Sequence, residues 1–468
     1  MKNLFYILIF SFTFLSYVQA QDRPEIRVRT AGERPIYWLH GLGGSQYSWD
    51  KVSTAVQLGT TGFAAREVQG LKPTYGPNSL SSAALDLEVE MKTFDGALDY
   101  NNNGFPIAKN MIIAHSQGGL VARRLDQIFN SPTDPDRRFG GLVTFGTPHG
   151  GAYILNSVRN DDHQDFIAEA CDAVMSGTIA DKSCNFFVWL LGTEERIDLV
   201  KDIICEDFAV FAVEQFLDDY TTPITDDYYV GAPVLQSLNN YSHPYLEKVA
   251  FYSEEDDPVF WRLIYNLFNE PNDFPAFGAN YDDQIVDEAG LNMYRAYGQA
   301  NIWEYRADDH PLGNFYCGNF FSQGKMYDIS DAYTVTGNWW ENANEKWEFL
   351  IGAKDIQNVY QGYCTCIIRT PEGYLDGVTY TESNPANCVN YESLPDHEEC
   401  YPTYGLQTVS YDSDGVVEEG SARDFPGATQ VQLLGSNHQQ MRNDENTKEG
   451  LSDLFSGFHG TYFATPVR

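Results

Sequence analysis

The sequence predicts an α/β fold, in which helices flank both faces of a mostly parallel sheet. Short apolar runs that lead into turns alternate with stretches of helical periodicity, and this alternation indicates the fold. The strand-like runs are residues 36–39, 111–114, 141–145, 249–252 and 428–434, and the helical stretches include 83–94 and 118–129. Parallel strands end at one edge of a sheet, so we expect active residues in the turns that follow the strands.

The stretch NMIIAHSQGGLVARRL, residues 110–125, places Ser116 between a strand-like run and a helix-like run. A turn this tight brings strand and helix close together, so the positions two before and two after the serine must be small. They are Ala114 and Gly118. The serine hydroxyl then projects from the top of the sheet. Ser116 is therefore the predicted nucleophile.

A serine hydroxyl is a weak nucleophile and needs a general base that a carboxylate orients. The predicted base is His438 in LLGSNHQQMRND, because it follows a strand-like run and comes after the serine and the candidate acids in the chain. His40 and His149 lie in glycine turns and are expected to hold these loops by hydrogen bonds. The side chain of His115 is expected to point away from the nucleophile.

Two segments offer the acid. In LQTVSYDSDGVVEEG, Asp414 follows the strand-like run 406–411, and a short span joins it to the strand before His438. We therefore expect the acid and the base on neighbouring strand ends. In VAFYSEEDDPVF, Asp256 and Asp257 also follow a strand-like run, but a large segment separates them from His438. Asp414 is preferred, Asp257 is the second choice and Asp412 the third.

A developing oxyanion needs backbone amides aimed at it. The HGLGG turn at residues 40–44 follows a strand-like run, and the amide of Leu42 is the predicted first donor. The amide of Gln117 opens the helix after Ser116 and is the predicted second donor. Each motif alone occurs by chance, but their order and their shared position after strand-like runs predict a serine hydrolase.

Charge and leader sequence restrict the partners and the compartment. The net charge of −36 argues against nucleic acids and anionic membrane surfaces as partners, because both repel an acidic protein. Residues 1–20 are typical of a signal peptide, with Lys2, an apolar run to Val18 and a small-residue cleavage site ending at Ala20. The run is short for a membrane span, so we expect export, secreted or periplasmic, without stable membrane insertion.

Residues 21–468 are predicted to form one domain with two insertions, 152–235 and 263–403. The first is helical in pattern, and the second is rich in aromatic residues. All eight cysteines fall within these insertions, at positions 171, 184, 205, 317, 364, 366, 388 and 400. Cysteines in an exported chain predict disulfides, here within the insertions, and their spacing does not indicate a zinc site.

Together, HGLGG, AHSQGG, FGTPHGG, SDGVV and SNHQQMRND resemble the lipase/esterase branch of the α/β-hydrolases, which includes secreted bacterial lipases and the GPI inositol-deacylase-like group. The resemblance covers residues 33–151, 230–262 and 404–460. It implies hydrolysis of small-molecule or lipid esters by a Ser-His-Asp triad through an acyl-enzyme, with residues 152–235 as a lid or cap. It implies no cofactor. Some secreted lipases carry a structural calcium near the acid loop, where Asp412 would be placed.

Two other functions stay open. One is a serine peptidase or amidase on the same fold, which the lipase-like glycine turns disfavour. The other is a non-catalytic protein that binds lipid or glycan through residues 263–403, which an intact triad disfavours. The natural substrate, the disulfide connectivity and the oligomeric state stay undetermined at this level.

Overall fold

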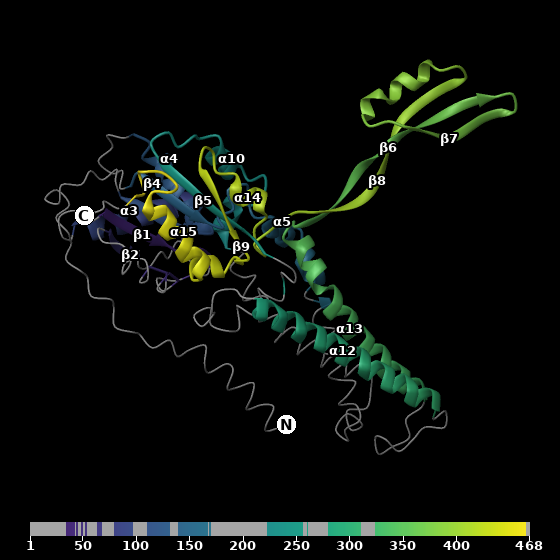
Figure 1. Cartoon of the computed structure of the whole chain (residues 1–468), viewed down its shortest axis with the longest axis horizontal. Helices are drawn as coiled ribbons and strands as arrows, with labels where there is room; N and C mark the ends of the chain where they lie inside the picture. The colour runs from purple at the N-terminus through teal and green to yellow at the C-terminus, as the bar shows by residue number, and fades with distance from the viewer. Residues whose placement is uncertain are drawn as a thin grey trace.

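The computed structural model describes a body from which two long elements project (Figure 1). The described residues are 34–42, 44, 48–49, 52–53, 63–67, 79–96, 110–131, 139–166, 168–169, 222–255, 260, 279–309 and 323–464. The predicted signal peptide, residues 1–20, lies outside them, as does the middle of the predicted cap. Within these ranges, no helix combines the length and the apolar character that crossing a bilayer requires.

The body is built on a six-stranded sheet in which all neighbouring strands are parallel. In spatial order its strands are β2 (Phe63–Glu67), β1 (Arg34–Leu39), β3 (Met111–His115), β4 (Gly141–Phe145), β5 (Glu247–Glu254) and β9 (Thr429–Leu434). The five strand-like runs of the main sheet expected from the sequence lie in β1, β3, β4, β5 and β9. This sheet and its flanking helices confirm the predicted fold class.

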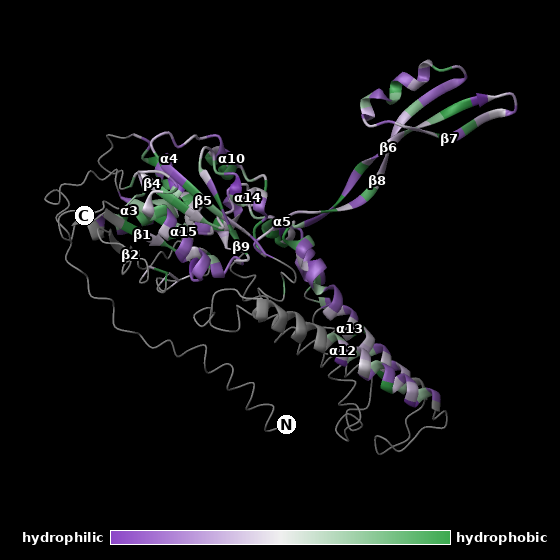
Figure 2. Cartoon of the chain, viewed as in Figure 1, coloured by the Kyte–Doolittle hydropathy of each residue, from purple (hydrophilic) through white to green (hydrophobic). Residues whose placement is uncertain are grey.

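The two faces of the sheet carry separate apolar cores, because side chains alternate along a strand. In β1, Tyr37 and Leu39 belong to the core beneath helices α3 (Leu80–Gly96), α4 (Gln117–Ile128) and α10 (Pro233–Asn239). Ile36 and Trp38 belong to the core on the opposite face, beneath α15 (Glu445–Ser456). Figure 2 shows hydrophobic residues gathered on the strands of the body. Among the described residues, the body also contains the shorter helices α5 (Tyr153–Arg159), η6 (Pro223–Asp227), α14 (Glu419–Arg423) and η10 (Gln440–Arg442).

One projection is a pair of long helices, α12 (Ala279–Asp309) and α13 (Gln323–Leu350), that pack along each other (Figure 1). Trp303 and Ala307 of α12 meet Met326 and Ile329 of α13 in a small apolar core of their own. The Ser330 hydroxyl also donates to the Ala300 carbonyl, 2.9 Å away. We call this pair the helical hairpin.

The other projection is an antiparallel arm made of β6 (Lys354–Thr370), β7 (Gly373–Thr381), η9 (Pro385–Ser393) and β8 (His397–Ser410). Two disulfides, Cys364–Cys388 and Cys366–Cys400, link its far end. They confirm a cysteine-bearing insertion. Cys171, Cys184, Cys205 and Cys317 lie outside the described residues.

The strand-like run before Asp414 has a different place from the one expected. Its residues up to Ser410 form the end of β8, which pairs with β6 in the arm and not with the parallel sheet. Asp414 reaches the sheet edge by another route, because the Glu255 amide just after β5 donates to the Ser413 carbonyl, 2.8 Å away. The expectation that the run before Asp414 ends on a strand next to the one before His438 was therefore wrong.

Candidate active site

Ser116 lies in the turn between β3 and α4, with φ 52° and ψ −132°. A residue other than glycine rarely adopts a positive φ, and such strain is typical of functional turns. The Ser116 amide donates to the Phe145 carbonyl, 2.9 Å away, which ties the turn to the end of β4. The side chain is half-buried, whereas the residues on both sides of it are buried. This is the sharp turn from strand to helix that the sequence predicted, and we call it the elbow.

Three glycines allow this turn to form, since each stands where a side chain would collide. A Cβ atom on Gly118 would lie 2.5 Å from the His40 carbonyl oxygen, and one on Gly41 would lie 2.6 Å from the Cβ atom of Ser116. A Cβ atom on Gly119 would lie 2.2 Å from Oγ1 of Thr147. The elbow is therefore packed between the HGLGG and FGTPHGG turns.

Asp414 and His438 form a buried hydrogen-bonded pair. Nδ1 of His438 donates to Oδ2 of Asp414 at 2.7 Å, and the two residues are 4% and 1% exposed. A carboxylate can only accept, so the proton of the neutral ring is on Nδ1 and Nε2 is left as the acceptor. The other carboxylate oxygen, Oδ1, accepts from the amides of Val416 at 3.0 Å and Val417 at 2.7 Å. The imidazole is thus held in the tautomer that a general base requires.

The pair and the elbow meet at the end of β4. A Cβ atom on Gly146 would lie 2.9 Å from Oδ2 of Asp414 and 3.1 Å from Nδ1 of His438. The residue before it, Phe145, accepts the Ser116 amide. All three predicted triad residues therefore gather at the same edge of the sheet.

His115 is a supporting residue that the sequence analysis missed. Its side chain lies against the His438 loop: the two rings are 4.6 Å apart between centroids, and its Nε2 is 2.7 Å from the His438 carbonyl oxygen. Burial lowers the pKa of His115 well below its usual range, so the ring is neutral and Nε2–H donates this bond. The partners are 323 positions apart, and no local pattern in the sequence could have indicated the contact.

Both predicted oxyanion donors lie beside Ser116. Gln117 is the first residue of α4, where backbone N–H groups have no acceptor within the helix. Its side-chain amide donates to the Tyr228 hydroxyl, 3.1 Å away. Leu42 directly follows Gly41, which packs against the Cβ atom of Ser116.

His40 and His149 hold their loops as expected. Nδ1 of His40 lies 2.8 Å from the Gly41 carbonyl oxygen. Nδ1 of His149 accepts from the Arg123 guanidinium at 3.0 Å, so its Nε2–H donates to the Thr144 hydroxyl at 3.0 Å. Burial lowers the pKa of His149 well below its usual range and that of Arg123 to about 9.

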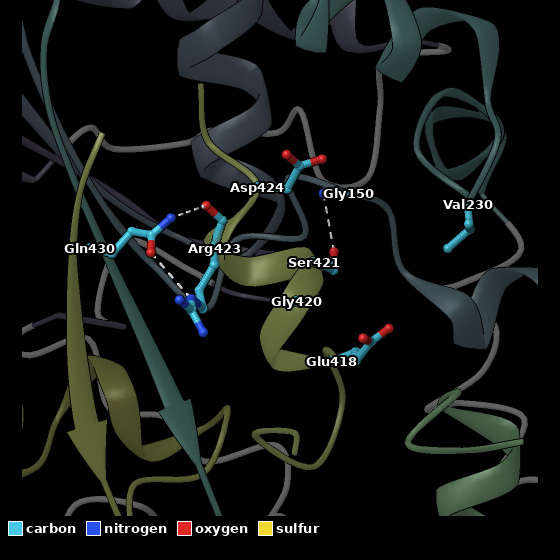
Figure 3. A pocket seen from close by; sticks show the side chains of 8 residues that line it. All are labelled: Gly150, Val230, Glu418, Gly420, Ser421, Arg423, Asp424 and Gln430. Atoms are coloured by element: carbon cyan, nitrogen blue, oxygen red, sulfur yellow. Dashed lines mark hydrogen bonds between the residues drawn. The ribbon is translucent and has the colours of Figure 1, made fainter. Parts of the chain in front are cut away.

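A polar pocket of about 470 Å³ lies along α14, beside the FGTPHGG turn (Figure 3). It is lined by Gly150, Val230, Glu418, Gly420, Ser421, Arg423, Asp424 and Gln430. The Gly150 amide donates to the Ser421 hydroxyl at 3.1 Å and so joins the turn to α14. None of the predicted catalytic residues lines this pocket.

Asp412, the residue considered for calcium, meets two other carboxylates. Oxygens of Glu254, Asp412 and Glu419 lie within 4.8 Å of one another. Calcium takes six to eight oxygen ligands, and the Arg423 guanidinium already pairs with Glu419 at 2.6 Å. The alternative acids, Asp256 and Asp257, lie outside the described residues.

Several solved hydrolases resemble the chain at low identity. The mature lipase BlEst2 of Bacillus licheniformis is 12% identical over 53% of this chain and 78% of that protein, with a TM-score of 0.29. Phospholipase PlaB from Legionella pneumophila is 10% identical over 49% of this chain and 41% of that protein, with a TM-score of 0.30. An extracellular alpha/beta-hydrolase from a Paenibacillus species is 12% identical over 47% and 77%, with a TM-score of 0.25.

No protein-family model matches the chain, and no curated protein matches its sequence. Likeness at these identities assigns neither a substrate nor catalytic residues.

Proposed function

We propose that this protein is an exported serine hydrolase that cleaves carboxylic esters of small molecules or lipids. The observation that carries the proposal is the buried Asp414–His438 hydrogen bond beside the strained Ser116 elbow. An unstrained turn or an unpaired histidine would not favour catalysis, whereas this combination has the order of roles that acyl transfer needs.

In the proposed reaction, Ser116 attacks the ester carbonyl while Nε2 of His438 takes the hydroxyl proton. The carboxylate of Asp414 keeps the imidazole oriented and stabilises its charged form. The amides of Leu42 and Gln117 receive the oxyanion. His438 then protonates the leaving alcohol, which gives an acyl-enzyme on Ser116. Water, activated by His438, releases the acid and restores the serine. The reaction needs no cofactor.

Export is part of the proposal and has independent support. Two disulfides lie in the arm, and disulfides persist in oxidising compartments. Together with the leader-like residues 1–20, they favour a secreted or periplasmic protein whose mature chain begins at Gln21. Edman sequencing and thiol titration of protein recovered from its native compartment test this step. A retained leader or reduced cysteines would contradict it.

The decisive test compares wild type with Ser116→Ala on p-nitrophenyl esters of rising acyl length, an acylated inositol and an aminoacyl anilide. We expect wild type to cleave esters and to be labelled by a fluorophosphonate. Ser116→Ala should lose both activities while keeping its circular dichroism spectrum, because it lacks only one oxygen. Preference for the anilide would make the protein an amidase, and absence of all turnover and labelling would favour a binding protein.

A further inference from the structure

The helical hairpin meets the acid loop at its base. Trp347, in the last turn of α13, donates its indole N–H to the Gly415 carbonyl at 2.8 Å, and its side chain is 3% exposed. Gly415 directly follows Asp414 and has a φ of 90°. A residue from the insertion therefore contacts the turn that carries the predicted acid.

Two aromatic rings and two backbone contacts hold Trp347 in place. Its ring centroid is 5.4 Å from that of Phe260 and 6.0 Å from that of Phe166. The carbonyl of Leu350, at the end of α13, accepts from the Ser157 hydroxyl at 2.8 Å. Just beyond the helix, the Ala353 carbonyl accepts from the Tyr411 amide at 2.7 Å. The end of the hairpin is therefore bonded to α5 through Ser157. The residues just after the hairpin are bonded to the segment before Asp414 through Tyr411.

The turn after Asp414 also orients its carboxylate. The amides of Val416 and Val417 hold Oδ1, and they belong to the two residues after the carbonyl that Trp347 binds. Removing the indole N–H would leave a buried carbonyl without this donor, which is costly. The turn can relieve that cost by rotating its peptide groups, and this movement would shift the Val416 and Val417 amides.

We propose that Trp347 is a positioning residue for Asp414, so that the inserted helical hairpin helps to aim the carboxylate at His438. The expected effect on turnover rests on the proposed function, whereas the expected effect on the orientation of the Asp414 carboxylate does not. The helical hairpin would then help to build the site.

The test replaces Trp347 with phenylalanine, which keeps an aromatic ring and removes the N–H. Trp303→Phe is the matched control: Trp303 is 4% exposed in the same hairpin, and its indole N–H donates no hydrogen bond among the described residues. The first readout is the low-field proton NMR signal of His438 Nδ1–H, assigned by its loss in His438→Gln. The second is kcat and KM on the best ester.

We expect Trp347→Phe to shift or broaden the NMR signal and to lower kcat about threefold to tenfold, with KM within about twofold, as loss of one buried hydrogen bond would cause. Trp303→Phe should match wild type in both readouts. An unchanged signal and kcat in a folded Trp347→Phe protein would overturn the proposal, as would an equal effect of Trp303→Phe.

If Trp347→Phe fails to fold, benzothienylalanine at position 347 keeps the bicyclic shape and replaces the N–H with sulfur. The same shift of the NMR signal is expected, and an unchanged signal overturns the proposal. If wild type cleaves no ester, the proposed function fails, but the NMR comparison still decides the role of Trp347.

Discussion

The carboxylate of Asp414 has an N–H donor on each side, and these donors set its orientation. The amides of Val416 and Val417 bind Oδ1, while His438 binds Oδ2. The His438 amide also donates to the Asp414 carbonyl at 2.7 Å, so the two residues are joined through main chain as well as side chain. An acid held in this way cannot rotate without breaking several bonds.

The choice of acid gives a prediction at this scale. Asp414→Asn should keep the fold and lower kcat by roughly 10³-fold or more, because an amide at this position no longer enforces the Nδ1–H tautomer. Asp257→Asn should leave kcat within about twofold of wild type. Steady-state kinetics of the two variants decide between the acids, and the reverse pattern would move the acid to Asp257.

A single glycine gives a second prediction. Gly119→Ala places a Cβ atom 2.2 Å from Oγ1 of Thr147, and such overpacking costs about 1–3 kcal/mol of unfolding free energy. Adding Thr147→Ala should restore part of this loss. Gly298→Ala is the control, since nothing lies within 4 Å of its Cβ position in α12. Urea unfolding measures the unfolding free energy of the three variant proteins. A Gly119→Ala protein as stable as wild type would contradict the close packing of Gly119 against Thr147.

At the scale of elements, α4 and the turn after β4 are joined by buried polar groups. Arg123 of α4 donates to His149 of the turn and, at 2.7 Å, to Oδ1 of Asn239 in α10. His243 and Asp126 form a further buried pair at 2.7 Å that adjoins Arg123. Through the bond between His149 and Thr144 of β4, this network ties α4 to the sheet.

The network predicts how stability depends on pH. Burial lowers the pKa of His149 in the folded protein, whereas the unfolded chain has an ordinary value of about 6.5. Below that pH the unfolded state binds a proton that the folded state does not. The unfolding free energy should therefore fall with falling pH, by up to about 1.4 kcal/mol per pH unit for this group.

Urea unfolding at a series of pH values between 7.5 and 5 measures this effect in wild type and in His149→Gln, which cannot be protonated. The variant should be less stable at neutral pH but should lose stability less steeply as the pH falls. His115 and His243, whose pKa values burial also lowers, keep some of the slope. Parallel slopes for the two proteins would show that His149 does not contribute.

At the scale of the whole molecule, the body and the arm are stabilised separately. Two extended cores cover the faces of the parallel sheet, whereas the far end of the arm is held by its disulfides and by strand pairing. A small antiparallel sheet has little apolar surface to bury, so covalent links carry much of its stability.

This separation predicts that Cys366→Ser combined with Cys400→Ser loosens the arm alone. Removing a disulfide costs about 2–4 kcal/mol, here from the local stability of the arm. Limited proteolysis should then cut within residues 354–410, while fluorophosphonate labelling of Ser116 stays within about twofold of wild type. Loss of labelling together with cleavage in the arm would show that the far end of the arm and the body unfold as one unit.

The sequence by itself determined the parallel strands that the structure contains, and it predicted the turn at Ser116 and the pairing of Asp414 with His438. These inferences rest on local constraints: alternation of apolar runs, small residues where strand and helix approach, and the order of motifs along the chain. Only the tertiary structure decided that Asp414 arrives from an antiparallel arm, that His115 supports the His438 loop and that Trp347 binds Gly415. These contacts join residues far apart in the chain, and packing creates them without any pattern that either partner carries alone.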